Sequence, residues 1–219
     1  MIALKTYTMQ EYVEFTDRMP GRFEYAHGQI FAVESPEPVE ESLIDYVLSP
    51  YFDLNQVTAQ FPIPTQLHDI LVSNLHGLLF AFFRGKSYRV YSQFTKVVIE
   101  WAEKSRMPDI LVVKKDVESR TSAHQVTNPI VMMEVLSKST QSIDKTEKLE
   151  EYQSLPSLQE YVLISQTQIR VVVYRRINSH KWEMEIIDQA DGIVTLSSLG
   201  CELPARDIYE DVDFETISN

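Results

Sequence analysis

Two acidic residues stand inside runs of apolar residues that predict buried strands. Asp109 lies in MPDILVV at 107–113, and Glu134 lies in NPIVMMEVLS at 128–137. Burial of a carboxylate in such a run is costly unless the group is paired or bound to a metal. Mg²⁺ takes oxygen ligands, typically one or two carboxylates together with water and substrate phosphate. Two carboxylates on neighbouring strands therefore predict a divalent-cation site.

The composition excludes several classes of protein. The chain has 219 residues with 44% hydrophobic content, enough for one domain with a real core. Glycine is scarce, and no glycine-rich phosphate-binding motif occurs, which excludes dinucleotide-binding and P-loop folds. The single cysteine, Cys201, excludes an intrachain disulfide and a cysteine-based zinc site.

The formal net charge of −12 weakens the case for tight, non-specific binding to naked DNA. A local basic groove can nevertheless coexist with an acidic exterior. The N-terminus lacks the long apolar segment of a signal peptide, and the apolar stretch 70–83 is too short and interrupted to span a bilayer. We therefore expect a cytoplasmic protein with no membrane partner.

Asp109 and Glu134 are carried by a chain in which predicted strands and helices alternate. Apolar spacing predicts helices at 8–18, 66–83 and 142–155. It predicts a hairpin at 22–33 that turns at His27-Gly28. One or two strands are predicted at 88–101, and further strands at 107–113, 128–136, 159–165, 168–176, 182–188 and 193–197.

The remaining segments are predicted to be irregular. The four prolines and the acidic patch of residues 34–62 predict an insertion. Residues 114–127 are predicted to form a polar connection. Asp191-Gly192 predicts a hairpin turn, and the tail 211–219 is expected to fray. The whole chain, 1–219, is expected to form a single α/β domain.

An ordered set of motifs resembles one known family. The motifs are RFEY-x-x-G at 22–28, His68 at the head of a helix, PDILVV, MEVLSKST at 133–140, Asp144…Lys148…Tyr152, and PSLQEYVLI at 156–164. Together they resemble the Uma-two type of restriction endonucleases, within the PD-(D/E)XK nuclease superfamily. The resemblance covers roughly residues 5–210, with the insertion at 34–62 outside it.

The resemblance implies a fold, an activity and a set of ligands. The fold would be a restriction-endonuclease-like mixed β-sheet flanked by helices, with additional C-terminal antiparallel strands. The activity would be hydrolysis of DNA phosphodiester bonds by water activated on Mg²⁺ or Mn²⁺. Asp109, Glu134 and the backbone carbonyl of Val135 would be the metal ligands, and Glu24 would be the acid of the first hairpin. The simpler alternatives are a salt-bridged strand acid for Glu134 and an exposed hairpin acid for Glu24.

One departure from the superfamily concerns its lysine, which normally follows the glutamate by two residues. Leu136 occupies that position here. Lys138 continues the strand register, whereas Lys148 lies on the next helix with Asp144 and Tyr152 four residues to either side, on one helical face. We favour Lys148, although a solvated i,i+4 pair is the simpler interpretation.

Other residues could support the site. His68 at a helix start would touch phosphate or the metal ligands, or would only cap the helix. Without metal, clustered carboxylates should raise the pKa of at least one of them, so Asp109→Asn is expected to stabilise the protein. Arg170, Arg175, Arg176 and Lys181 form a short basic stripe that would contact phosphate or simply be solvated.

The leading hypothesis is a Mg²⁺-dependent endonuclease that binds DNA weakly, with a homodimer or a partner supplying a basic groove. A second hypothesis is a nuclease-fold protein without catalysis, which the acidic charge and Leu136 favour. A third, weaker hypothesis is a metal-dependent hydrolase of small phosphoesters.

Overall fold

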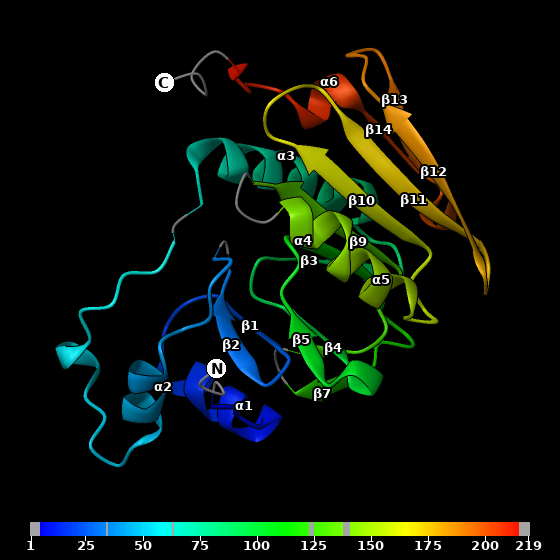
Figure 1. Ribbon diagram of the computed structural model, residues 1–219. Helices are drawn as coiled ribbons and strands as arrows, with labels where there is room; N and C mark the ends of the chain where they lie inside the picture. Colours follow the sequence, from blue (N-terminus) through cyan, green and yellow to red (C-terminus); the bar gives the residue numbers. More distant parts are fainter. Residues whose placement is uncertain (1–4, 34, 63, 123–124, 138–140, 215–219) are drawn as a thin grey trace.

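The computed structural model describes residues 5–33, 35–62, 64–122, 125–137 and 141–214. Its centre is a mixed six-stranded sheet in the order β12-β11-β10-β9-β6-β3 (Figure 1). The strands are β3 (Tyr88–Ser92), β6 (Ile110–Lys114), β9 (Val131–Leu136), β10 (Glu160–Ser165), β11 (Val171–Asn178) and β12 (Lys181–Ile187). Only β9 and β10 pair in parallel within this sheet, and the chain joins them through α4 (Gln141–Lys145) and α5 (Glu147–Gln153). This crossover places α5 over the sheet beside β9.

Strand alternation divides the central sheet into two faces. Val131, Met133 and Val135 of β9 pack into the cluster formed with α3 (Gln66–Phe83). Met132 belongs to the cluster on the opposite face, which contains Tyr152 of α5. Because side chains alternate along a strand, Glu134 shares the face of Met132 and is directed toward α5.

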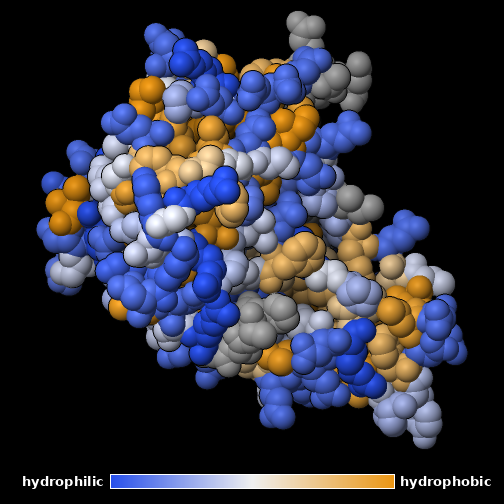
Figure 2. All heavy atoms as spheres, turned by 180° about the vertical axis from the view of Figure 1, so that it is seen from behind, coloured by the Kyte–Doolittle hydropathy of each residue, from blue (hydrophilic) through white to orange (hydrophobic). Residues whose placement is uncertain are grey.

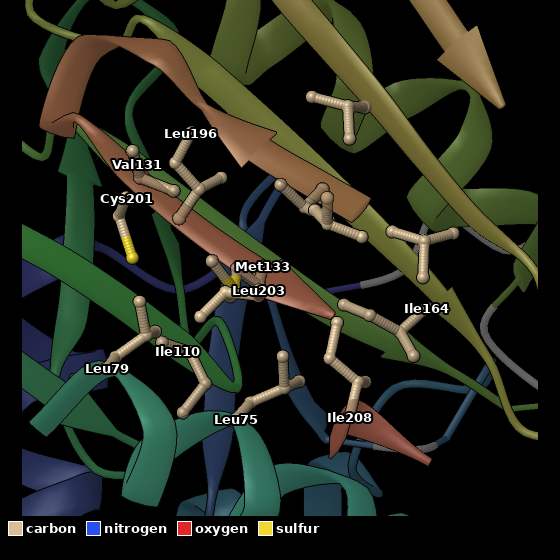
Figure 3. Close-up of a cluster of buried hydrophobic side chains, with 14 of the residues drawn as sticks. Leu75, Leu79, Ile110, Val131, Met133, Ile164, Leu196, Cys201, Leu203 and Ile208 are labelled. Atoms are coloured by element: carbon tan, nitrogen blue, oxygen red, sulfur yellow. The ribbon is translucent and has the colours of Figure 1, made fainter. Parts of the chain in front are cut away.

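The face opposite α5 holds the larger hydrophobic core. Leu75 and Leu79 of α3 lie against Ile110 of β6 and Met133 of β9 (Figure 3). The chain continues into β13 (Ile193–Leu196), β14 (Cys201–Pro204) and α6 (Ala205–Ile208), which complete this layer. Cys201 is buried here as a small apolar residue (Figure 3). The antiparallel β13–β14 pair confirms the predicted C-terminal antiparallel strands.

A second sheet carries the N-terminal hairpin. Its order is β2-β1-β5-β4-β8-β7. The strands are β1 (Phe23–Ala26), β2 (Gln29–Ala32), β4 (Lys96–Ile99), β5 (Lys104–Arg106), β7 (Arg120–Ser122) and β8 (Gln125–Val126). His27 and Gly28 turn the β1–β2 hairpin with φ values of 52° and 72°, the left-handed pair that a tight two-residue hairpin requires.

A separate hydrophobic cluster packs against the N-terminal hairpin. It joins α1 (Met9–Arg18) and α2 (Glu41–Leu48) to β1 and β2. Thr8 caps α1 through a capping box with Glu11. Viewed from behind, these elements form the lobe at lower right, where hydrophobic and hydrophilic residues are mixed at the surface (Figure 2).

Several predicted elements differ from the structure. The predicted helix 142–155 is two helices, interrupted at Thr146. Residues 88–101, predicted as one or two strands, form two, β3 and β4, which belong to different sheets and are followed by η2 (Glu100–Ala102). Asp191-Gly192 does not close a hairpin, because β12 and β13 lie in different sheets. A two-residue turn signal does not specify which strands will pair: β12 pairs with β11, and β13 with β14.

The segments expected to be irregular contain regular structure. Residues 34–62 include α2 and η1 (Leu54–Gln56), and the polar connection 114–127 includes β7 and β8. η3 (Ser197–Leu199) links β13 to β14. The tail from 215 onward lies outside the described residues. No helix in the described part of the chain is long and apolar enough to cross a membrane.

Candidate functional site

Asp109 immediately precedes β6 and is held by three donors. Arg22 Nη2 donates to Oδ1 at 3.0 Å, while His68 Nε2 lies 3.0 Å from Oδ2. The backbone N–H of Val135 donates to Oδ2 at 2.9 Å, and the N–H of Asp109 donates to Glu134 Oε2 at 3.3 Å. These reciprocal bonds across the β6–β9 pair bring the two predicted ligand carboxylates together, as the sequence predicts.

Lys148 lies at the centre of the acidic residues. Its Nζ is 3.1 Å from Glu134 Oε1, 3.2 Å from Glu24 Oε1 and 3.0 Å from Asp144 Oδ1. Tyr152 donates its hydroxyl to Glu134 Oε1 at 3.2 Å. Lys148 is 5% exposed, so it is not the solvated helical residue of the simpler interpretation. The spacing of four residues thus places Asp144, Lys148 and Tyr152 together around Glu134.

The sequence analysis missed a second layer of charges behind this centre. Arg106 donates from Nη1 to Glu24 Oε2 at 3.2 Å and from Nε to Glu151 Oε2 at 2.8 Å. Lys104 Nζ donates to Glu147 Oε1 at 2.8 Å and also contacts Glu151. These pairs tie β5 to α5 and so fix the helix that carries Lys148. Arg106 stands three residues before Asp109, which is the only sequence signal that could have found it.

Glu24 is buried on β1, so it is not the exposed hairpin acid of the alternative interpretation. Burial alone would raise its pKa, but the charges of Lys148 and Arg106 and the backbone N–H of Met107 hold that pKa below its ordinary value. The carboxylate therefore stays ionised.

The pKa values of Asp109 and Glu134 are shifted in opposite directions. Burial would raise the pKa of Asp109, yet the hydrogen bond and charge of His68, followed by the charge of Arg22, lower it. Burial raises the pKa of Glu134 well above its ordinary value; Lys148 opposes this rise, and the charges of Asp144, Asp109 and Glu24 add to it. The expectation that Asp109→Asn stabilises the protein is therefore reversed: the unfavourable charge is that of Glu134.

The cations and phenols of the site respond to the same acidic surroundings. Burial would lower the pKa of Lys148, but Asp144, Glu134 and Glu24 raise it well above its ordinary value, so the ammonium stays charged. Burial, followed by the charges of Glu134 and Glu24, raises the pKa of Tyr152 well above its ordinary value, so the phenol remains a donor.

A cavity of about 230 Å³ opens onto this centre. One wall is charged, and the facing wall is formed by the hairpin and the residues that follow it. The charged wall comprises Glu24, Arg106, Asp109, Glu134, Asp144, Glu147 and Lys148, and the facing wall includes Phe31, Ala32, Val33 and Pro36. Val135 also lines the cavity. A reacting phosphate in this cavity would meet both the predicted ligands and the lysine.

The donor set fits a hard divalent cation. Asp109 and Glu134 supply carboxylate oxygens to one cavity. Asp109 Oδ1 and Glu134 Oε2 each accept one hydrogen bond, so each of these two oxygens keeps a lone pair for a cation. Within the described residues, no three histidine, cysteine, aspartate or glutamate side chains are arranged to hold a metal ion. The predicted set is of another kind, two carboxylates and a backbone carbonyl completed by water, which is the pattern typical of Mg²⁺.

The remaining predicted residues have varied positions. His68 is buried and bound to Asp109, so it is more than a surface cap, although its backbone N–H also donates to the capping hydroxyl of Thr65. Leu136 carries no amine, and Lys138 lies outside the described residues. Arg176 donates to the carbonyls of Gln153, Leu155 and Leu158, which assigns the basic stripe at least one structural role.

Comparisons with known proteins agree with this architecture. Residues 51–206 match the model of the Uma2 family, described as "Putative restriction endonuclease". The N-terminal hairpin with Glu24 precedes the matched residues. An uncharacterized protein of Synechocystis sp. is 33% identical over 116 residues, which is 52% of this chain and 66% of that protein. A second one from the same organism is 24% identical over 205 residues, covering 94% of this chain and 92% of that protein.

One solved structure resembles nearly the whole molecule. It is the crystal structure of "a putative nuclease" from Anabaena variabilis, with a TM-score of 0.63 and 18% identity. The match covers 92% of this chain and 97% of that one. At this identity the likeness shows a common fold, which confirms the predicted α/β architecture.

Proposed function

This chain belongs to the Uma2 family, and from that membership we propose that it is a Mg²⁺- or Mn²⁺-dependent endonuclease that hydrolyses phosphodiester bonds of DNA. One observation carries the proposal. The carboxylates of Glu24, Asp109, Glu134 and Asp144 converge with the ammonium of Lys148 on a single cavity. So many buried acids are costly to retain without a function that uses them.

Asp109, Glu134 and the carbonyl of Val135 are the proposed metal ligands. When bound there, a divalent ion would polarise a phosphoryl oxygen and lower the pKa of a bound water, so that hydroxide forms near neutral pH. Arg22 and His68 keep Asp109 ionised and oriented by their bonds to its two oxygens. Tyr152 and Lys148 orient Glu134 from the opposite side.

Lys148 takes the role of the lysine that the strand lacks at Leu136. Its ammonium lines the cavity and lies 3.1 Å from Glu134, beside the place where phosphate would bind. There it would stabilise negative charge on the attacked phosphate and orient the attacking water. Glu24 and Asp144 hold the ammonium in this position through their ion pairs.

The net charge of −12 makes weak, salt-sensitive DNA binding the expectation. We retain the homodimer as a proposed assembly, because two copies would present two sites to one duplex.

Cleavage of supercoiled plasmid tests the proposal. Wild type should produce nicked or linear DNA with Mg²⁺ or Mn²⁺ and none with EDTA. Glu134→Gln should abolish cleavage, whereas Glu183→Gln, a matched change at an exposed acid of β12, should leave it intact. Absence of cleavage by wild type, or equal cleavage by Glu134→Gln, would contradict the proposal, and the first result would favour the non-catalytic binding module.

A further inference from the structure

Two separate hollows lie between α3 and β3, on the side of the sheet that carries α3, and together they are called the α3–β3 groove. The first is lined by Asp69, Val72, Ser73, His76, Ser92 and Gln93, and the second by Phe80, Phe83, Arg84, Gly85, Tyr88, Arg89, Val90 and Lys115. Both hollows have α3 on one side and β3 with its ends on the other. β3 is an edge strand of its sheet, so the groove is open along one side.

The first hollow adjoins the candidate site. Gln93 donates its backbone N–H to the carbonyl of Asp109 at 3.0 Å, and its own carbonyl accepts from Arg22 Nε at 3.1 Å. Arg22 in turn binds the carboxylate of Asp109. A chain molecule that leaves the site past Asp109 would therefore enter the groove at Gln93.

The far end of the groove is strongly basic for so acidic a chain. Five of the 20 lysine and arginine residues gather there, namely Arg84, Lys86, Arg89, Lys114 and Lys115. Arg89 is paired with Glu118, and Lys114 with Asp116. Among the described residues, Arg84, Lys86 and Lys115 have no ion-pair partner, and all three are exposed. Unpaired, exposed cations of this kind suit a polyanion.

Aromatic rings lie between the two ends. Phe80 is 60% exposed, and its ring stacks on that of His76 at 6.1 Å between centroids and 19° between planes. Tyr88 borders the same hollow, and Lys86 sits over the ring of Phe82 at 3.3 Å. An exposed ring alone is ordinary. Lys115 Nζ donates to the carbonyl of Lys86 at 2.7 Å, so these cations are held beside the rings without an ion pair. Rings that alternate with such cations are typical of surfaces that bind single-stranded nucleic acid, where bases stack and phosphates pair.

We infer that the α3–β3 groove binds a single strand of DNA that extends from the cleaved phosphate toward Arg84 and Lys115. β3 pairs with β6, with Ser92 opposite Ile110 and Tyr88 opposite Lys114. Lys114 follows Asp109 by five residues of extended chain, so the basic end lies about 17 Å from Asp109 along the strand direction. The inference rests on the proposed function, because it assigns the groove to the substrate of that site. It also supplies within one chain a basic surface that the sequence analysis assigned to a dimer or a partner.

Fluorescence anisotropy in EDTA tests the groove without cleavage. The probe is a fluorescein-labelled oligothymidylate of about 12 nucleotides, within the size that such surfaces cover. Arg84→Ala/Lys115→Ala should weaken binding at least about tenfold and lower the salt slope of log affinity by about 1.4, since each phosphate contact on a single strand contributes about 0.7. The charge-matched control Lys5→Ala/Arg206→Ala, at exposed positions elsewhere, should change affinity less than about twofold.

The aromatic contribution has its own pair of variants. Phe80→Leu should weaken binding roughly tenfold, whereas Phe80→Trp should retain it, because a larger ring still stacks on a base. Melting temperatures of all variants verify that the fold is intact.

The inference is overturned if wild type does not bind the probe, if the two double variants weaken binding equally, or if oligoaspartate competes as well as unlabelled oligothymidylate. The last result would assign the groove to acidic peptides. Plasmid cleavage separates this inference from the proposed function. If the groove variants lose binding but wild type does not cleave plasmid, only the proposed nuclease activity is refuted. If wild type cleaves plasmid but the groove variants bind the probe normally, only the inference about the groove is refuted.

Discussion

Lys148 and Glu134 stand 14 residues apart on different elements, and their charged atoms lie 3.1 Å apart in the interior. Lys148 also faces Glu24 and Asp144, so one buried ammonium is shared by three carboxylates. The charge of the site is therefore not balanced by its own lysine. That imbalance is the physical reason for expecting a divalent cation beside Asp109 and Glu134.

Without metal, Glu134→Gln should stabilise the protein at neutral pH. The pKa of Glu134 is raised above its ordinary value in the folded state, first by burial, so this group stabilises the fold fully only below that ordinary value. Its contribution is lost as the pH rises through the raised pKa. Chemical denaturation in EDTA should thus show the variant more stable than wild type at pH 7 and equal to it at about pH 4.

Asp109→Asn should have the opposite effect on the free energy of unfolding. His68 and Arg22 lower the pKa of Asp109 against the effect of burial, so the ionised carboxylate is the form that the fold favours. Neutralising it should destabilise the protein at pH 7 in the same denaturation series. If Asp109→Asn stabilises the protein, or if Glu134→Gln destabilises it, the pKa shifts assigned to these two carboxylates are wrong.

Lys148→Ala should destabilise the protein by about 3–5 kcal/mol, because it leaves buried carboxylates without their cation. Urea unfolding measures this, with Lys145→Ala, an exposed neighbour, expected to change stability by less than about 0.5 kcal/mol. The double variant Glu134→Gln/Lys148→Met should recover part of the lost stability, because both members of the pair are neutral. A double variant as unstable as Lys148→Ala would contradict this account of the pair.

Glu147→Gln should remove part of the acid sensitivity of the fold. Burial would raise the pKa of Glu147, but hydrogen bonding to Lys104 and the charge of Arg106 lower it from 4.5 to about 2. A depressed pKa stabilises the fold above the ordinary value, and the contribution disappears as the pH falls from 4.5 toward 2. The difference in Tm between wild type and variant should therefore shrink across that range.

The control for this series is Glu150→Gln, which changes an exposed acid on the same helix. Its Tm should differ little from that of wild type at any pH. A Glu147→Gln difference that stays constant from pH 4.5 to pH 2 would contradict the assigned pKa.

The predictable part of the site consists of residues whose local pattern is unusual. Asp109 and Glu134 are conspicuous because each interrupts an apolar run, and burial of a carboxylate there requires an explanation. The helix Gln66–Phe83 was predicted with its correct ends because its apolar spacing runs unbroken. The i±4 spacing around Lys148 likewise predicted that Asp144 and Tyr152 would accompany it.

The part that could not be predicted depends on contacts between distant segments. Arg106 reaches Glu24 across 82 residues and Glu151 across 45, and neither separation leaves a periodic signal. The break at Thr146, whose backbone leaves helical geometry, likewise has no signal in the sequence, because the apolar spacing continues through it. β7 and β8 are short polar strands whose pairing, not their composition, defines them.

Calorimetric titration with Mn²⁺ tests the central claim most directly. Wild type should bind the ion, Asp109→Asn and Glu134→Gln should each lose at least about tenfold in affinity, and the exposed-acid control Glu183→Gln should bind like wild type. Binding by wild type that both site variants retain unchanged would place the ion elsewhere. No binding by wild type would contradict the metal centre itself.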